Sequence, residues 1–331
     1  MDYYKFNENK VMKKHSYIEQ CVCGNHSELN IENNILRNSY SLATCAECNF
    51  KFTYPRPNID FLIDYYNSIS SVRFYKFSDE ICIKDSKGIY ADIKKYNPEA
   101  KTVLEIGGST GYYLNGLKLR GYDVIGSELS ADAVKLAKEW YNIKMYEAEF
   151  PPTSYEGSFD VIIIHHVIEH VIDPINFIAV SKKYLSKKGI IIIETPNVNS
   201  IGIKIFGRHY PVFCPPGHLN YFSITTIKEL LGNGSVAKLI TTSYSGQSLY
   251  NFANATFSLL SIKRLINQVI SREQKVETNQ NVSTLNNSKY SVLLFSQKIS
   301  KILQIIIFPI FWTIDKLNMG ENLNFILRNE K

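Results

Sequence analysis

Short apolar runs alternate with amphipathic stretches through the middle of the chain. Each apolar run predicts a strand, and each stretch with apolar residues at helical spacing predicts a helix. Strands and helices that alternate in this way build a doubly wound α/β sheet. The predicted strands begin at residues 103, 122, 159, 189 and 236, and the predicted helices cover 112–120, 130–141, 174–185 and 223–231.

The last strand of the predicted sheet comes late, at residues 320–328, so about seventy residues are inserted before it. In this insert, 272–290 is polar and predicts a loop, whereas 292–308 carries apolar residues at helical spacing. The most hydrophobic segment of the chain, 302–314, has 13 residues and is too short to span a bilayer.

Two interpretations of the apolar insert stay open. Because Lys298 and Lys301 lie beside apolar positions, residues 292–314 could make a peripheral contact with an anionic membrane. Alternatively, the same residues cover the core or form a dimer contact. The oligomeric state is left open.

Composition narrows the classes of protein. The chain has 331 residues, of which 45% are hydrophobic and 21% charged, as in a folded globular protein. Its net charge of +6 is mild, and its Lys and Arg residues are scattered, so no nucleic-acid partner is expected. Residues 1–8 lack the apolar core of a signal peptide. We expect a cytoplasmic protein, with membrane association through 292–314 as an option.

One predicted strand runs into a glycine-rich turn. Gly107, Gly108 and Gly111 lack Cβ atoms where the backbone turns sharply and approaches a ligand. Glu105 places a carboxylate just before this turn. The next strand ends at Glu128, where a carboxylate can accept the hydroxyls of a ribose. This spacing fits a nicotinamide or an S-adenosylmethionine site, and the charge of Glu105 favours the second because it suits an ammonium group and opposes a pyrophosphate.

Residues 98–245 resemble a class I S-adenosylmethionine-dependent methyltransferase, because further motifs match in the expected order at 159–174, 189–197 and 217–223. The resemblance implies a Rossmann-like doubly wound sheet of seven strands with S-adenosyl-L-methionine as cofactor. Glu105 and the glycine turn would hold its methionine end, and Glu128 its ribose. Glu149 or Phe150 would contact the adenine, and His165 would lie near the transferable methyl group.

Four cysteines, Cys21, Cys23, Cys45 and Cys48, lie within the first fifty residues. Four thiolates suit a tetrahedral structural zinc ion, and the segment is too short for a core of its own. The Cys-x-Cys spacing of the first pair is irregular, so His26 could replace one ligand. The alternative is four unrelated reduced cysteines.

The cysteine segment also resembles the zinc-binding module of one methyltransferase subgroup. That module closes with an aromatic-Pro-Arg-Pro turn, which is residues 50–57 here. The resemblance implies a structural zinc ion and an acceptor that is a sugar, a nucleotide sugar or a lipid-linked glycan of bacterial surface-polysaccharide synthesis.

The histidines supply the candidate chemistry. His166 or His218 could remove a proton from the acceptor, with Tyr221 as a hydrogen-bonding partner. Alternatively, the spacing of His166, Glu169 and His170 suits one helical face, and with His218 these residues could bind a divalent metal. That arrangement would favour metal-assisted O-methylation of a small diol.

A noncatalytic S-adenosylmethionine-binding scaffold is the remaining alternative. The predicted regions are a zinc-ribbon-like module (1–58), a helical linker or lid (59–97), the methyltransferase core (98–245), a helical insert (246–318) and the last core strand (319–331).

Overall fold

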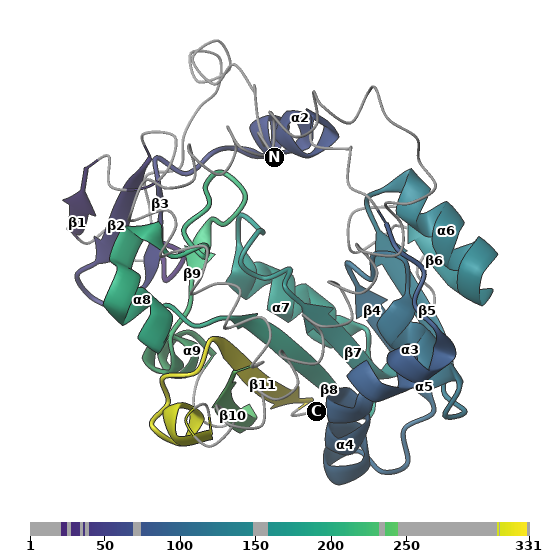
Figure 1. The fold of residues 1–331 in the computed structure, drawn as a ribbon. Helices are drawn as coiled ribbons and strands as arrows, with labels where there is room; N and C mark the ends of the chain where they lie inside the picture. The colour runs from purple at the N-terminus through teal and green to yellow at the C-terminus, as the bar shows by residue number, and fades with distance from the viewer. Residues whose placement is uncertain are drawn as a thin grey trace, which may run out of the picture. The chain divides into compact units, whose positions relative to one another are not determined.

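The computed structural model describes residues 21–24, 28–33, 36, 40–68, 74–147, 158–231, 236–243, 310 and 312–329 (Figure 1). The chain divides into two compact units. Unit 1 comprises Met1–Pro196, Cys214–Ile240 and Leu323–Lys331, and unit 2 comprises Asn197–Phe213 and Thr241–Asn322.

A seven-stranded sheet with the order β10-β11-β8-β7-β4-β5-β6 confirms the predicted fold class. β4 pairs in parallel with β5 on one side and with β7 on the other. The chain therefore reverses direction across the sheet at β4, and doubly wound sheets bind ligands at the carboxyl ends of strands at such a point. The strands are β4 (Thr102–Ile106), β5 (Asp123–Glu128), β6 (Lys144–Glu147), β7 (Phe159–His165), β8 (Leu185–Pro196), β10 (Val236–Thr242) and β11 (Asn322–Arg328).

The crossover helices begin within one residue of the predicted starts and end within two residues of the predicted ends. Ser130 caps one helix by accepting a hydrogen bond from the Ala133 amide. Asp173 caps another through the Asn176 amide, with Pro174 in the first turn. The helices are α5 (Tyr112–Lys118), α6 (Ala131–Tyr141), α7 (Pro174–Lys183) and α9 (Ile224–Leu231).

The central strands β4 and β7 are buried on both faces. Leu104 and Ile162 pack in one apolar cluster, and Val103 and Val161 pack in another. Burial of each such side chain contributes about 1.5–3 kcal/mol. This continuous burial explains why the strands appear in the sequence as unbroken apolar runs.

A second, four-stranded sheet has the order β1-β2-β3-β9. Its first three strands come from the cysteine-rich segment, and the fourth is a two-residue strand from far along the chain. The predicted module therefore extends beyond residues 1–58, because β9 completes its sheet. The strands are β1 (Leu29–Glu32), β2 (Ser41–Cys45), β3 (Lys51–Tyr54) and β9 (Asn220–Tyr221).

Three helices, α2 (Ile59–Ser68), α3 (Asp79–Asp85) and α4 (Lys87–Tyr96), occupy the predicted helical linker. α3 packs closely on α5, where a Cβ added to Gly116 would lie 2.1 Å from the carbonyl oxygen of Cys82. Asn115 on α5 also donates a 2.8 Å hydrogen bond to Asp79. This contact places α3 against the helix that follows the glycine turn.

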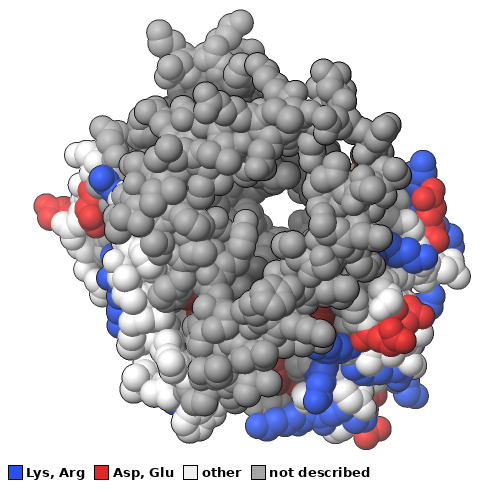
Figure 2. Space-filling view, viewed as in Figure 1, with Lys and Arg blue, Asp and Glu red and all other residues white. Residues whose placement is uncertain are grey.

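In unit 2, α8 (Ile201–Phe206) is followed by a 3-10 turn at Gly207–His209. The Tyr210 hydroxyl donates to the Glu321 carboxylate. The predicted loop at 272–290 and helical stretch at 292–308 lie outside the described residues. Within the described part, no helix is both long and apolar enough to cross a membrane. Figure 2 shows Lys and Arg interspersed with Asp and Glu on the described part of one face.

Candidate functional site

The glycine turn after β4 is tightly packed. The Gly107 and Gly108 amides donate to the Ser127 carbonyl over 2.8 and 3.0 Å, and Gly107 has a φ of +70°. A Cβ on Gly107 would lie 2.5 Å from Cγ2 of Val167, and a Cβ on Gly108 would lie 3.0 Å from Cε of Met145. Position 111 also favours glycine, because its φ is +78°. A side chain at these positions would therefore clash with its neighbours or strain the backbone.

Glu105 is an unsatisfied buried acid beside the turn. Its side chain is 3% exposed, and its Oε2 atom has no hydrogen-bond partner in the described part of the chain. Burial, together with the negative charge of Glu128, raises the pKa of Glu105 to about 8. A buried carboxylate in this position suits a cationic ligand, so the residues present fit the ammonium end of S-adenosylmethionine.

Glu128 orders the loops around the same site. Its Oε2 accepts the Ser109 amide at 2.9 Å, and its Oε1 accepts the Leu129 and Ser130 amides at 2.8 and 3.0 Å. These three bonds leave one of the carboxylate's roughly four acceptor positions unused by them. Glu128 could therefore bind a ribose hydroxyl directly only through that remaining position or after one of these bonds breaks.

Aromatic rings follow the glycine turn. Tyr112 lies 5.1 Å from Phe77 and 4.1 Å from Tyr113, measured between ring centroids. Tyr113 in turn meets His165 at 5.2 Å with perpendicular rings. Burial lowers the pKa of His165, so its ring is neutral at pH 7. His165 thus lies at the end of β7, beside the end of β4, as an uncharged part of an aromatic cluster.

His166 lies between two carboxylates. Its Nδ1 is 3.2 Å from Glu169 Oε1, and its Nε2 is 3.3 Å from Glu194 Oε1. Burial of the ring opposes its charged form, but hydrogen bonds to both acids outweigh that effect and raise the pKa of His166 to about 10. His166 is therefore protonated at neutral pH, with both ring nitrogens engaged, although its side chain is 49% exposed.

Glu169 is the anionic centre of the histidine cluster. Its side chain is 1% exposed, and its Oε2 accepts a 3.0 Å hydrogen bond from the Thr195 hydroxyl. Burial raises its pKa, but the hydrogen bond from His166 and the charges of nearby histidines outweigh this and lower the pKa to about 2. Glu169 is thus ionised over the whole neutral range.

His170 and His218 converge on Glu169. His170 Nδ1 is 2.8 Å from the Gly217 carbonyl, so this nitrogen donates its N–H to that oxygen. The two imidazole rings lie 4.8 Å apart between centroids. One ligand atom from each of Glu169, His170 and His218 lies within 4.8 Å of the others. Residues 168–170 form a turn here and not the helical face expected from their spacing, yet three of the four predicted ligands meet.

Tyr221 contacts the backbone of His218. Its hydroxyl is 2.9 Å from Thr53 Oγ1 and donates to the His218 carbonyl over 3.2 Å. The side chain is 1% exposed, and burial raises its pKa above the usual range. Its hydroxyl is therefore a neutral donor.

The four N-terminal cysteines come together as predicted. Cys21 Sγ lies 3.5 Å from Cys48 Sγ, and Cys23 Sγ lies 3.8 Å from Cys45 Sγ. All four sulfur atoms lie within 4.8 Å of one another. A tetrahedral zinc ion with Zn–S bonds of about 2.3 Å separates its sulfurs by roughly 3.8 Å, so this cluster fits such an ion.

Thiol chemistry supports the same fit. Burial raises the pKa of Cys48 to about 12 and that of Cys21 further still. Without a cation both thiols are neutral, whereas a metal would deprotonate them. His26, the alternative ligand, lies outside the described residues, as do the adenine-site candidates Glu149 and Phe150.

Two site residues were missed by the sequence predictions. Glu194 ends the apolar run of β8, in register with His165, just as Glu105 lies near the end of β4. A carboxylate residue at the end of an apolar strand is therefore the sequence signal that could have identified Glu194. Tyr113 follows the glycine turn and gave no signal beyond its position.

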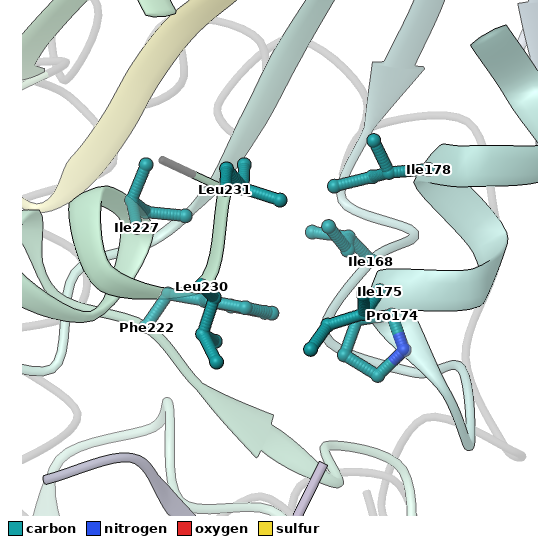
Figure 3. Close-up of a pocket in the computed structure, with 8 residues that line it drawn as sticks. All are labelled: Ile168, Pro174, Ile175, Ile178, Phe222, Ile227, Leu230 and Leu231. Atoms are coloured by element: carbon teal, nitrogen blue, oxygen red, sulfur yellow. The ribbon is translucent and has the colours of Figure 1, made fainter. Parts of the chain in front are cut away.

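An apolar cleft lies between α7 and α9 (Figure 3). Its cavity volume is about 10 Å³, which is barely enough for one water molecule. It is a packing gap and not an acceptor site. Its lining residues are Ile168, Pro174, Ile175, Ile178, Phe222, Ile227, Leu230 and Leu231.

Comparison with known proteins agrees with this geometry. Residues 84–233 match a family described as a methyltransferase domain. This part of the chain is a class I S-adenosylmethionine-dependent methyltransferase domain.

Similar proteins include two curated relatives named ubiquinone biosynthesis O-methyltransferase. That of Paraburkholderia phymatum is 29% identical over 171 residues, covering 49% of this chain and 73% of the relative. That of Hydrogenovibrio crunogenus is 25% identical over 134 residues, covering 35% of this chain and 56% of the relative, so the chain spans little more than half of that protein. A S-adenosylmethionine-dependent methyltransferase structure from Archaeoglobus fulgidus is 16% identical with a TM-score of 0.44, covering 82% of this chain and all of that one.

Proposed function

We propose that this protein transfers the methyl group of S-adenosylmethionine to a sugar, a nucleotide sugar or a lipid-linked glycan. The observation that carries the cofactor part is Glu105, a buried carboxylate whose Oε2 has no hydrogen-bond partner among the described residues. It lies beside a turn that only glycine fits. The bound cofactor would supply an activated methyl group on a sulfonium leaving group, and the protein would hold the acceptor in line with it.

The acceptor class is supported by the N-terminal module. Its four clustered sulfurs fit a structural zinc ion, and residues 50–57 close the module with the aromatic-Pro-Arg-Pro turn of the sugar-methylating subgroup. The curated relatives are O-methyltransferases by name, which supports a hydroxyl as the methylated group.

His218 is the proton acceptor that this geometry favours. A hydroxyl must lose its proton as the methyl group arrives, so a base is needed. His166 is a poor candidate because both of its nitrogens face carboxylates and its pKa is raised to about 10. The nearby Glu169 carboxylate would stabilise His218 once it carries the proton.

A second candidate is metal-assisted O-methylation of a small diol. The ligand atoms of Glu169, His170 and His218 lie within 4.8 Å of one another, and the His170 Nδ1–H donates to a backbone carbonyl, as metal-bound histidines usually do. Two histidines and a glutamate form an established zinc ligand set. In this case His218 would be a ligand and not a base.

Peripheral membrane contact is a further part of the proposal, because it would bring a lipid-linked acceptor within reach. Two apolar side chains at the end of the predicted segment, Ile310 and Trp312, are 57% and 55% exposed, and Leu317 just after it is 63% exposed. Lys316 lies beside the Trp312 ring at 5.6 Å. Such a pairing suits the headgroup region of an anionic membrane. Flotation with phosphatidylglycerol vesicles, compared between wild type and Trp312→Ser, tests it: equal binding by both proteins, or by neither, would remove this part.

The test of function uses methyl-labelled S-adenosylmethionine with panels of nucleotide sugars, lipid-linked glycans and catechols. His218→Gln is compared with His209→Gln, a matched histidine change on unit 2. Base catalysis predicts a loss of about 10²-fold in kcat for His218→Gln, with no effect of EDTA. Metal assistance instead predicts loss of activity in EDTA and its return with added Mg²⁺ or Zn²⁺. Cofactor binding without labelling of any acceptor would favour a scaffold.

A further inference from the structure

The cysteine module and the segment that carries His218 form one sheet. Strand β3 pairs antiparallel with β9, with Phe52 opposite Asn220 and Lys51 opposite Tyr221. β9 begins two residues after His218. The module therefore reaches the histidine cluster through its own hydrogen-bonded backbone.

Thr53 makes the most direct connection. Its Oγ1 donates to the His218 carbonyl over 2.8 Å and lies 2.9 Å from the Tyr221 hydroxyl. Its amide donates to the Leu219 carbonyl over 2.9 Å. Because Thr53 is fully buried, water cannot replace these bonds when they are lost.

Arg56 connects the same module to the loop that carries Glu169 and His170. It donates to the Asn220 side-chain oxygen over 3.1 Å and to the Ile172 carbonyl over 2.7 Å. Asn220 then donates to the carbonyls of Ile168 and Val171 over 3.1 and 2.7 Å. With Arg56 1% exposed and Asn220 2% exposed, the two loops are braced from inside the protein.

Two backbone hydrogen bonds complete this bracing. The amides of Leu219 and Asn220 both donate to the Glu169 carbonyl, over 2.8 and 3.0 Å. The loop with His218 and the loop with Glu169 are thus fixed to each other and to β3. Reacting groups must be held to within a fraction of an ångström, so a shift of either loop would move the imidazole of His218 relative to the acceptor.

We propose that Thr53 and Arg56 are positioning residues for His218, so that the cysteine module helps to assemble the catalytic centre of the methyltransferase domain. This inference rests on the proposed role of His218. It gives the module a function beyond its own stability, because its third strand sets where the base lies.

The test compares Thr53→Val, which removes the hydroxyl and keeps the shape, with Thr53→Ser, which keeps the hydroxyl. Thr44→Val on neighbouring β2 is the matched control. The probe is diethyl pyrocarbonate, with modification of each histidine followed by mass spectrometry. In Thr53→Val the rate at His218 should change by about threefold or more, since the His218 carbonyl and the Tyr221 hydroxyl each lose their hydrogen bond to Thr53. The rate at His209 and the S-adenosylmethionine affinity should stay unchanged, and Thr53→Ser should restore the wild-type rate.

An unchanged rate at His218 in Thr53→Val, or an equal change in Thr44→Val, would overturn the proposal. If Thr53→Val does not fold, Arg56→Lys gives the second measurement, because lysine keeps the charge but cannot make both hydrogen bonds. An unchanged rate at His218 in folded Arg56→Lys would likewise overturn it. Failure of the proposed function is seen separately, as a wild-type protein that transfers no methyl group.

Once an acceptor has been identified, Thr53→Val should lower kcat about tenfold and leave the KM for S-adenosylmethionine unchanged. Equal loss of kcat in Thr53→Ser would contradict positioning by the hydroxyl.

Discussion

Glu105 and Glu128 lie near the carboxyl ends of adjacent parallel strands, and the charge of Glu128 adds to burial in raising the pKa of Glu105 to about 8. The protein thus keeps a buried acid that is costly to ionise until a cation binds beside it. Such a residue lowers stability in exchange for ligand affinity, which is common at binding sites.

The Glu105→Gln variant should therefore become more stable relative to the wild type as the pH rises. The wild-type carboxyl has a pKa of about 8 in the folded protein against 4.5 when unfolded. Between these values the folded state binds more protons, so wild-type stability falls as pH increases, by at most about 1.4 kcal/mol per pH unit. Glutamine removes this slope. Urea unfolding at pH 5 and pH 8 measures it.

The same variant should lose S-adenosylmethionine affinity by about tenfold or more, because a neutral amide cannot pair with the ammonium group. Glu147→Gln, at the end of β6, is the control and should leave both properties unchanged. Wild-type affinity in Glu105→Gln would refute the assignment of Glu105 to the methionine end.

Because of His166, we expect the protein to lose stability at alkaline pH. Its pKa is raised from 6.5 to about 10, so its ion pairs stabilise the protein fully below pH 6.5 and are lost as the pH rises through about 10. His166→Gln should lack this alkaline slope and be less stable at pH 7 by about 1 kcal/mol at most, because the His166 side chain is 49% exposed and solvent screens its ion pairs. Thermal unfolding between pH 6 and pH 10 measures the difference, and parallel curves for the two proteins would show that His166 is not charged.

The cysteine cluster predicts about one zinc ion per chain. Cys45→Ser should release it and make residues 21–54 sensitive to protease, because the module has little core of its own. Metal content by plasma mass spectrometry and limited trypsin digestion provide the measurements. Cys214→Ser, outside the cluster, should retain the metal. Equal metal content in Cys45→Ser and wild type would rule out the zinc site.

Because of Asp160, we expect the protein to lose stability at acid pH. Burial raises its pKa, but bonds from the Lys101 and Thr102 amides and from Ser186 outweigh this and lower the pKa below the usual value. Asp160→Asn should be about 1–3 kcal/mol less stable at pH 7. Its contribution is present above pH 4 and is lost as the pH falls further, so the two proteins should converge in acid. A constant difference from pH 3 to pH 7 would contradict this role.

The parallel strands could be predicted from sequence because they are buried on both faces. Runs such as Ile190–Ile193 have no polar residue that could face water, and the glycine turn marks where β4 ends. The four cysteines could be predicted to cluster for a different reason, because four cysteines in one short segment are typical of a metal site.

The bracing of the histidines could not be predicted. Thr53 and the carbonyl of His218 lie 165 residues apart, and β9 is only two residues long, so no local pattern marks their pairing. The engagement of both nitrogens of His166 was equally hidden. It depends on Glu194 from a neighbouring strand, which periodicity alone cannot place.

Calorimetric titration of the wild-type protein with S-adenosylmethionine, and separately with NADH, tests the central claim most directly. We predict saturable binding of S-adenosylmethionine with about one site per chain and no heat with NADH, because Glu105 attracts an ammonium group and repels a pyrophosphate. NADH binding, or no binding of S-adenosylmethionine, would contradict the account.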